Sequence, residues 1–134
     1  MGPPDMQESP RLYSPYDAPL WSSIRDGRMR LQQCSTCGQF RYPPGPACPD
    51  CLSLADEWKE ISGRAAVLSW TVIHKQYLPA YPAPYVVVAA RLDEGPILIG
   101  NIDYADLPHL RLDTPLAIVY GDGPGFRIPR FELR

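Results

Sequence analysis

The chain has 134 residues, of which 45% are hydrophobic, and a formal net charge of −2. This length provides one compact domain with a small appendage and excludes two full hydrophobic cores. The missing basic excess argues against a nucleic-acid-binding module, and no apolar run approaches the roughly 20 residues that span a bilayer, so neither nucleic acid nor a membrane is an expected partner.

Residues 1–15 are rich in proline, serine and acidic side chains and contain little to bury. This composition is typical of a flexible tail. The first ten residues, MGPPDMQESP, have neither the basic start nor the apolar stretch of a secretory signal. We therefore expect a cytoplasmic protein, in which reduced thiols favour metal binding over disulfides.

A short amphipathic helix is predicted over residues 18–26, with Asp17 as its N-cap. Gly27 is suited to end it, because glycine readily adopts the left-handed conformation that follows many helices. Trp21 and Ile24 fall on one face. So short a helix is marginal alone, and this face either packs within the molecule or contacts a ligand or partner.

A strand is predicted after the helix. Residues 28–32 alternate polar and apolar side chains, with Met29 and Leu31 on one face. This strand leads into the first cysteine pair. The helix and lead strand together occupy residues 16–33, and a metal-binding ribbon follows over residues 34–62.

Four cysteines form two pairs with the spacing CxxC–x10–CxxC: Cys34, Cys37, Cys48 and Cys51. A two-residue spacer lets both sulfurs of one turn point at the same ion, and two such turns complete the tetrahedron that zinc prefers. Disulfides or free core thiols are a poor alternative for this spacing in a cytoplasmic chain. Four thiolates leave no position for a substrate, so the zinc is expected to be structural.

Iron is the alternative metal, because the same four-sulfur geometry occurs in rubredoxins. An iron site would make the chain a one-electron carrier. Gly38 follows the first knuckle, where a positive φ is commonly needed. Leu52 stands where the second knuckle of such carriers normally has glycine, and this difference favours zinc.

Residues 63–134 have the pattern of a β domain. Runs of β-branched and aromatic residues, separated by turn residues, predict five strands with one helical turn between the third and the fourth. The strands cover residues 64–74, 85–92, 97–102, 116–120 and 126–133, and the turn covers residues 103–110. This is the order of an OB-fold. The predicted class is mainly β (α+β), with an N-terminal helix, a rubredoxin-like zinc ribbon and a C-terminal five-stranded OB-fold barrel.

No catalytic constellation is visible in the sequence. The two histidines, His74 and His109, have no nucleophile or carboxylate at a recognisable spacing. All four cysteines are assigned to the metal. The chain is therefore predicted not to be an enzyme on its own.

The remaining candidate contact residues are aromatic or basic. Tyr77, Tyr81 and Tyr85 lie on a proline-rich loop that either grips a ligand or partner or merely covers one end of the barrel. Arg41 flanks the ribbon and is a candidate contact for a phosphate. A solvated surface is the alternative for this arginine.

The order of these segments resembles the DUF35 family, whose members join a rubredoxin-like zinc ribbon to an OB-fold. The resemblance covers roughly residues 16–133. It rests on the cysteine spacing and on the segments PLWSSIRDGRMRLQQC, RYPPGPACPDC, SGRAAVLSWTVIH, GPILIGNI and PRFEL. The four metal cysteines are intact, whereas no family-wide ligand motif transfers residue by residue.

The resemblance implies an accessory role. Members of the family bind beside thiolase-like proteins, including the lipid-transfer type, that make or break carbon–carbon bonds of acyl-CoA substrates; some pair with hydratase-type partners. The chain is thereby expected to join a hetero-oligomer and to contact acyl-CoA, a thiolase-like partner or both. Binding of single-stranded nucleic acid by the OB-fold is the alternative, and the balanced charge argues against it.

Overall fold

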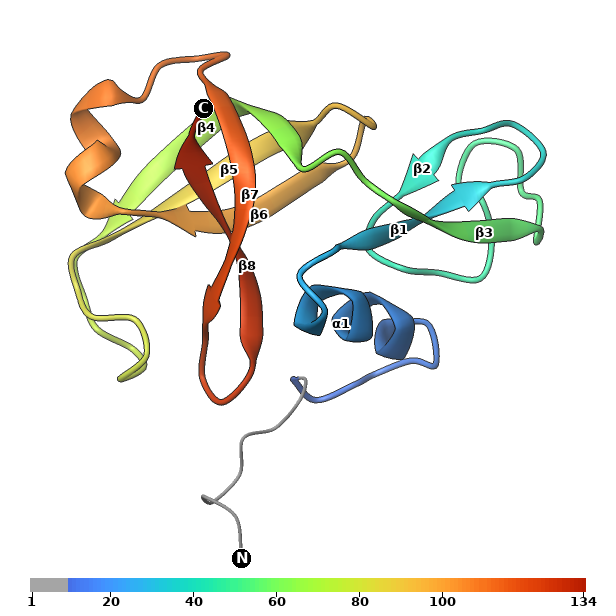
Figure 1. The fold of residues 1–134 in the computed structure, drawn as a ribbon, viewed down its shortest axis with the longest axis horizontal. Helices are drawn as coiled ribbons and strands as arrows, with labels where there is room; N and C mark the ends of the chain where they lie inside the picture. Colours follow the sequence, from blue (N-terminus) through green and yellow to red (C-terminus); the bar gives the residue numbers. More distant parts are fainter. Residues whose placement is uncertain (1–9) are drawn as a thin grey trace, which may run out of the picture.

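The computed structural model describes residues 10–134, which fold into two antiparallel sheets and one α-helix (Figure 1). The elements in chain order are α1 (Asp17–Arg25), β1 (Arg30–Cys34), β2 (Phe40–Arg41), β3 (Asp56–Glu60), β4 (Arg64–Ile73), β5 (Tyr85–Leu92), β6 (Ile97–Ile102), the 3₁₀ helix η1 (Tyr104–His109), β7 (Pro115–Asp122) and β8 (Arg127–Leu133). Residues 1–9 of the predicted tail lie outside the described residues. The predicted mainly β class is confirmed.

The start of α1 differs from the prediction. The helix begins at Asp17, and its N-cap is Tyr16, which makes no side-chain capping bond. The Asp17 carboxylate instead accepts hydrogen bonds from the amides of Tyr13 and Ser14, each at 3.0 Å. Asp17 therefore ties down the preceding chain, and its charge in the first turn still suits the helix dipole. Gly27, with a φ of 73°, follows the last turn as predicted.

The ribbon is a three-stranded antiparallel sheet in the order β2-β1-β3. Its central strand begins at Arg30, later than the predicted residue 28, and runs to Cys34. Met29, just before this strand, and Leu31, within it, are buried. They belong to the same hydrophobic cluster as the barrel core, so the base of the ribbon packs directly on the barrel.

The second sheet has the order β6-β5-β4-β7-β8, with η1 between β6 and β7, and the predicted five-stranded OB-fold is confirmed. A register shift between Val67 and Ser69 gives β4 one extra residue, which bends this long strand. β6 and β8 approach each other where the barrel closes. A Cβ atom at Gly100 would lie 2.8 Å from the ring of Phe131, so this close approach requires glycine.

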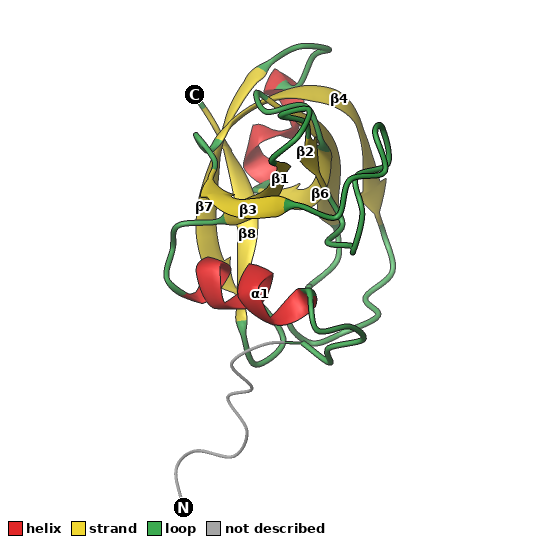
Figure 2. Ribbon diagram, turned by 90° about the vertical axis from the view of Figure 1, so that its right-hand side faces the viewer, coloured by secondary structure: helices red, strands yellow, loops and turns green. Residues whose placement is uncertain are grey.

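The helix α1 lies beside the tip of the β7–β8 hairpin, as Figures 1 and 2 show from two directions. Trp21 packs edge-on against Phe126, with ring centroids 5.4 Å apart. Tyr120 accepts a hydrogen bond at its hydroxyl from the Met29 amide, at 2.8 Å. These contacts fix the helix and the start of the ribbon on the barrel. Among residues 10–134, no helix is long and apolar enough to cross a membrane.

Candidate metal centre and ligand groove

Two similar turns present the four cysteines. In the first, the amide of Gly38 donates to the carbonyl of Cys34, and in the second the amide of Leu52 donates to the carbonyl of Cys48, both at 2.9 Å. Gly38 and Leu52 both have positive φ, at 80° and 64°. Leu52 therefore occupies a conformation that costs a side-chain-bearing residue about 1 kcal/mol. The second knuckle keeps the turn geometry although it lacks the glycine.

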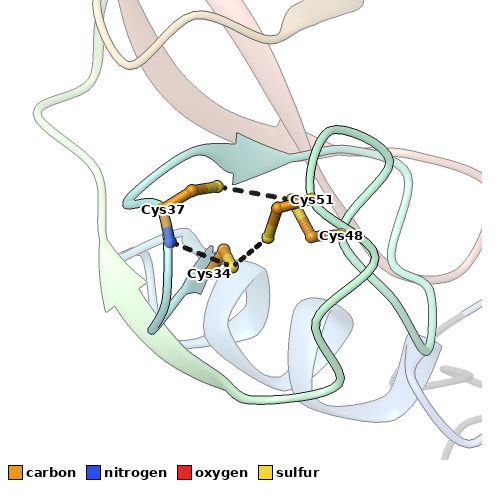
Figure 3. Close-up of side chains that lie close together, drawn as sticks. All are labelled: Cys34, Cys37, Cys48 and Cys51. Carbon is orange, nitrogen blue, oxygen red and sulfur yellow. Dashed lines mark hydrogen bonds between the residues drawn. The ribbon is translucent and has the colours of Figure 1, made fainter.

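The four thiols converge on one point, as Figure 3 shows. Their sulfur atoms all lie within 4.8 Å of one another, and the pairs Cys34–Cys51 and Cys37–Cys48 are each 3.5 Å apart. Four sulfurs bound at about 2.3 Å to a tetrahedral zinc ion lie about 3.8 Å from one another. The observed separations bracket this value, so the four thiols fit a zinc ion and fill its coordination shell.

Backbone amides favour the thiolate form of the two buried cysteines. The amide of Cys37 lies 3.5 Å from the sulfur of Cys34 and lowers the pKa of Cys34 to about 6. The amide of Cys51 likewise lowers the pKa of Cys48. The thiolate is the form that binds metal, so these backbone amides favour the metal-binding form of Cys34 and Cys48.

A second candidate site lies where α1, β6 and β8 meet the proline-rich loop. Two cavities of about 150 Å³ and about 160 Å³ adjoin there, and Tyr81 and Asn101 line both. We term the combined hollow the aromatic groove. Its aromatic lining residues are Trp21, Tyr42, Tyr81, Tyr85 and Tyr104. The structure thus brings together four of the predicted contact residues, Trp21, Ile24, Tyr81 and Tyr85. The rings of Tyr81 and Tyr85 lie 5.9 Å apart.

Ile24 forms part of the floor of the groove and is only 1% exposed, because it packs into the core. The other two predicted contact residues, Tyr77 and Arg41, lie outside the groove. Tyr77 is 68% exposed, lines neither cavity and has the ammonium of Lys75 over its ring at 5.3 Å. Arg41 is 6% exposed and pairs with Asp56 inside the ribbon. The guanidinium of Arg41 is thus used within the fold, which argues against the predicted contact with a phosphate.

Sequence reasoning missed several residues of the aromatic groove. Tyr42, Arg130 and the neighbouring pair Asn101 and Tyr104 come from three separate segments, which line one groove only because the barrel closes and α1 packs on it. No short motif connects them. Burial raises the pKa of Tyr42 and of Tyr81, which keeps both hydroxyls protonated as hydrogen-bond donors.

A short helix, a four-cysteine ribbon and a five-stranded barrel define a zinc-ribbon/OB-fold protein. Residues 21–57 match the family model for the ChsH2 rubredoxin-like zinc ribbon domain, and residues 58–121 match that for the ChsH2 C-terminal OB-fold domain. A solved structure described as "Ltp2-ChsH2(DUF35) aldolase" aligns with a TM-score of 0.83 and 28% identity, over 93% of this chain and 98% of that chain. The chain belongs to the DUF35 family, in its ChsH2 branch.

Curated relatives are similar over most or part of this chain. A probable enoyl-CoA hydratase alpha subunit of Thermomonospora curvata is 36% identical over 118 residues, which are 87% of this chain and 37% of the relative. A DUF35 domain-containing scaffold protein of Pyrococcus furiosus is 31% identical over 85 residues, 61% of each chain. The chain therefore spans little more than a third of the first relative and under two thirds of the second.

Proposed function

We propose that this chain is a non-catalytic zinc-ribbon/OB-fold subunit that binds beside a thiolase-like enzyme in a complex acting on acyl-CoA thioesters. The observation that carries the proposal is the alignment of helix, ribbon and barrel together with nearly the whole matched chain of the Ltp2-ChsH2(DUF35) aldolase. Relatives named as a scaffold protein and as a hydratase subunit support the same role. The complex would be a cytoplasmic hetero-oligomer, with structural zinc in the ribbon.

The aromatic groove is the proposed contact site for acyl-CoA or for the entrance of the partner's active site. Its stiff aromatic side chains lose little conformational entropy on binding, and their apolar faces exclude water. Trp21, Tyr81 and Tyr85 form its walls. The chain would position and desolvate the thioester, and the partner would make or break the carbon–carbon bond.

The distribution of reactive side chains supports placing the chemistry in the partner. His74 and His109 are both exposed and line neither cavity of the groove. All four cysteines of the chain converge on the metal centre. The described residues therefore offer the groove no thiol nucleophile and no histidine base.

Co-expression with thiolase-like proteins, followed by size-exclusion chromatography, tests the partnership. We expect the zinc-loaded chain to co-elute with one such protein, and acyl-CoA turnover to require the complex. The isolated chain should show no thiolase, aldolase or hydratase activity. Separate elution of both proteins, with the partner fully active alone, would contradict the proposal.

The aromatic groove is tested by a matched pair of tyrosine substitutions. Tyr81→Ala removes a ring shared by both cavities, whereas Tyr77→Ala removes an exposed ring from the same loop that lines neither. Binding of a saturated acyl-CoA, measured by isothermal titration calorimetry on the complex, should weaken by about tenfold or more for Tyr81→Ala and stay unchanged for Tyr77→Ala. Equal effects of the two substitutions would argue against the groove.

Two further measurements separate this function from its rivals. Tight binding of a single-stranded oligonucleotide at low salt would favour a nucleic-acid-binding OB protein, although the net charge of −2 argues against it. Metal analysis and a visible absorption spectrum distinguish colourless zinc from iron. Stoichiometric iron would favour the electron carrier.

A further inference from the structure

Arg41 is the one charged side chain among the described residues that is buried, with 6% of its surface exposed. Removing a guanidinium from water is costly unless it is paired and hydrogen-bonded. Its ion-pair partner is Asp56 on β3, whose side chain is 19% exposed. Arg41 ends β2, between the two cysteine pairs in the sequence. Its burial beside the metal centre therefore calls for a physical explanation.

Two side chains, those of Gln32 and Arg41, converge on the backbone of one residue, Gly45, and the carboxylate of Asp56 joins them. The Gln32 side-chain amide accepts from the Gly45 amide and donates to the Gly45 carbonyl, both at 2.9 Å. Arg41 donates to the same carbonyl from Nε at 3.3 Å and from Nη2 at 3.2 Å. The Asp56 carboxylate accepts from both Arg41 and Gln32. We term Gln32, Arg41, Gly45 and Asp56 the Gly45 clamp.

The Gly45 clamp joins the segments that carry the two cysteine pairs. Gln32 and Cys34 lie on β1, and Asp56 lies opposite Cys34 in the β1–β3 register. Gly45 belongs to the segment between β2 and Cys48, which contains no helix or strand. Side-chain hydrogen bonds, and not sheet pairing, therefore tie this segment, which leads into the second cysteine pair, to the sheet that carries the first pair.

We propose that the Gly45 clamp is a positioning network for the metal, which holds the second cysteine pair at ligand distance from the first and slows release of the ion. Its side chains supply none of the four sulfurs. An ion held by both pairs leaves only when the pairs move apart, and the clamp opposes that local opening. Groups that orient metal ligands from outside the coordination shell typically change metal affinity by about 10- to 100-fold.

The test compares three substitutions in the ribbon. Gln32→Leu nearly preserves volume but removes both bonds to Gly45, and Arg41→Lys keeps the charge opposite Asp56 but loses the planar fork. Lys59→Met is the control, because it breaks the exposed pair of Lys59 with Glu57 on β3. Zinc transfer to excess chromogenic chelator should be about 10- to 100-fold faster for Gln32→Leu. It should be moderately faster for Arg41→Lys and change less than about twofold for Lys59→Met.

A second readout distinguishes positioning from general stabilisation. The visible spectrum of the cobalt-substituted protein should be the same in all variants, because the four thiolate ligands are unchanged. Unfolding rates of the whole chain, measured in denaturant, should change less than zinc release. Release rates within about twofold of the parent for both Gln32→Leu and Arg41→Lys would overturn the proposal, as would faster release fully matched by faster unfolding. If Gln32→Leu does not fold, Arg41→Lys carries the same comparison.

Discussion

The ribbon and the barrel are both antiparallel sheets, but their interiors differ in chemistry. The barrel encloses side chains that are aliphatic or aromatic and lie out of water. They include Val67, Val86, Val88, Ala90, Leu92, Leu98, Ile102, Leu110, Leu116 and Phe131. The buried side chains near the metal centre are instead sulfur-containing or polar: Cys34, Cys48, Gln32 and Arg41. Burial of apolar area therefore stabilises the barrel, whereas the outer ribbon depends on metal–sulfur bonds and hydrogen bonds.

The boundary between these two modes of stabilisation does not coincide with the boundary between the sheets. Met29 and Leu31, at the base of the ribbon, belong to the barrel's hydrophobic cluster, together with Leu20 and Ile24 of α1. The order of α1 and the start of β1 should therefore not require the metal. The metal-dependent part begins near Cys34, at the end of β1.

The largest expected effect is that of losing the metal, which should disorder the outer ribbon and leave the barrel folded. Metal binding contributes about 10 kcal/mol to folding of a site that is absent from the unfolded chain. Cys37 is exposed, so Cys37→Ser removes a ligand with little disturbance of packing. We expect loss of metal and of amide-exchange protection over the outer ribbon, with the barrel still protected. Metal content per chain and residue-resolved hydrogen exchange measure both effects.

Ser35→Ala, in the same turn, is the control for Cys37→Ser and should retain full metal content. Unchanged metal content in Cys37→Ser would contradict the four-thiolate site. Loss of amide-exchange protection throughout the barrel in Cys37→Ser would contradict the inference that the barrel folds without the metal.

A cavity in the barrel core should have the opposite effect: it should destabilise the barrel and leave the metal centre intact. Leu110 is fully buried, whereas Leu112, two residues later, is 70% exposed. Leu110→Ala should lower the free energy of unfolding by about 2–5 kcal/mol, because it removes buried methyl groups and leaves a void. Leu112→Ala should change it by less than about 0.5 kcal/mol. Urea denaturation measures the difference, and both variants should bind a full equivalent of zinc. Loss of zinc from folded Leu110→Ala would show that the two regions are coupled.

The architecture was largely predictable because its signals are local. β5 and β6 have the predicted bounds, since runs of apolar, largely β-branched residues and the turn at Gly95 determine them within a short segment. The metal centre was predictable for the same reason, because two residues separate the cysteines of each pair. The start of α1 was mispredicted because the carboxylate of Asp17 accepts hydrogen bonds from amides that precede the helix. The sequence does not reveal which amides an aspartate will bind.

The aromatic groove and the role of Arg41 depend on contacts between distant segments. Arg41 resembles any exposed arginine in the sequence, and its partner Asp56 is recognisable only after β3 pairs with β1. Tyr104 and Trp21 join one groove only after the barrel closes and α1 packs on it. Hydrophobic periodicity and cysteine spacing describe residues that are close along the chain. They therefore identify the helices, strands and metal-binding turns, but not the surfaces that these elements form together.

The smallest expected effect concerns an exposed ion pair at the junction between the two regions. Arg28, which precedes β1, donates two hydrogen bonds to the carboxylate of Glu60 at the end of β3, at 3.2 Å and 2.9 Å. The hydrogen bond from Arg28 lowers the pKa of Glu60 below its usual value. Both side chains are largely exposed, so solvent screens the pair and its contribution to stability is small.

The sign of the pH dependence follows from the lowered pKa. A carboxyl whose pKa is lower in the folded than in the unfolded state adds stability above the unfolded pKa, about 4.3 for glutamate, and this is lost as the pH falls through the folded pKa. Glu60→Gln should therefore melt slightly below the parent at pH 7, and the difference should vanish in acid. Acid also protonates the metal thiolates, but it does so in both proteins, so the difference between their melting curves isolates the pair. A difference that stayed constant from pH 7 to pH 3 would assign the effect to packing at the junction and not to charge.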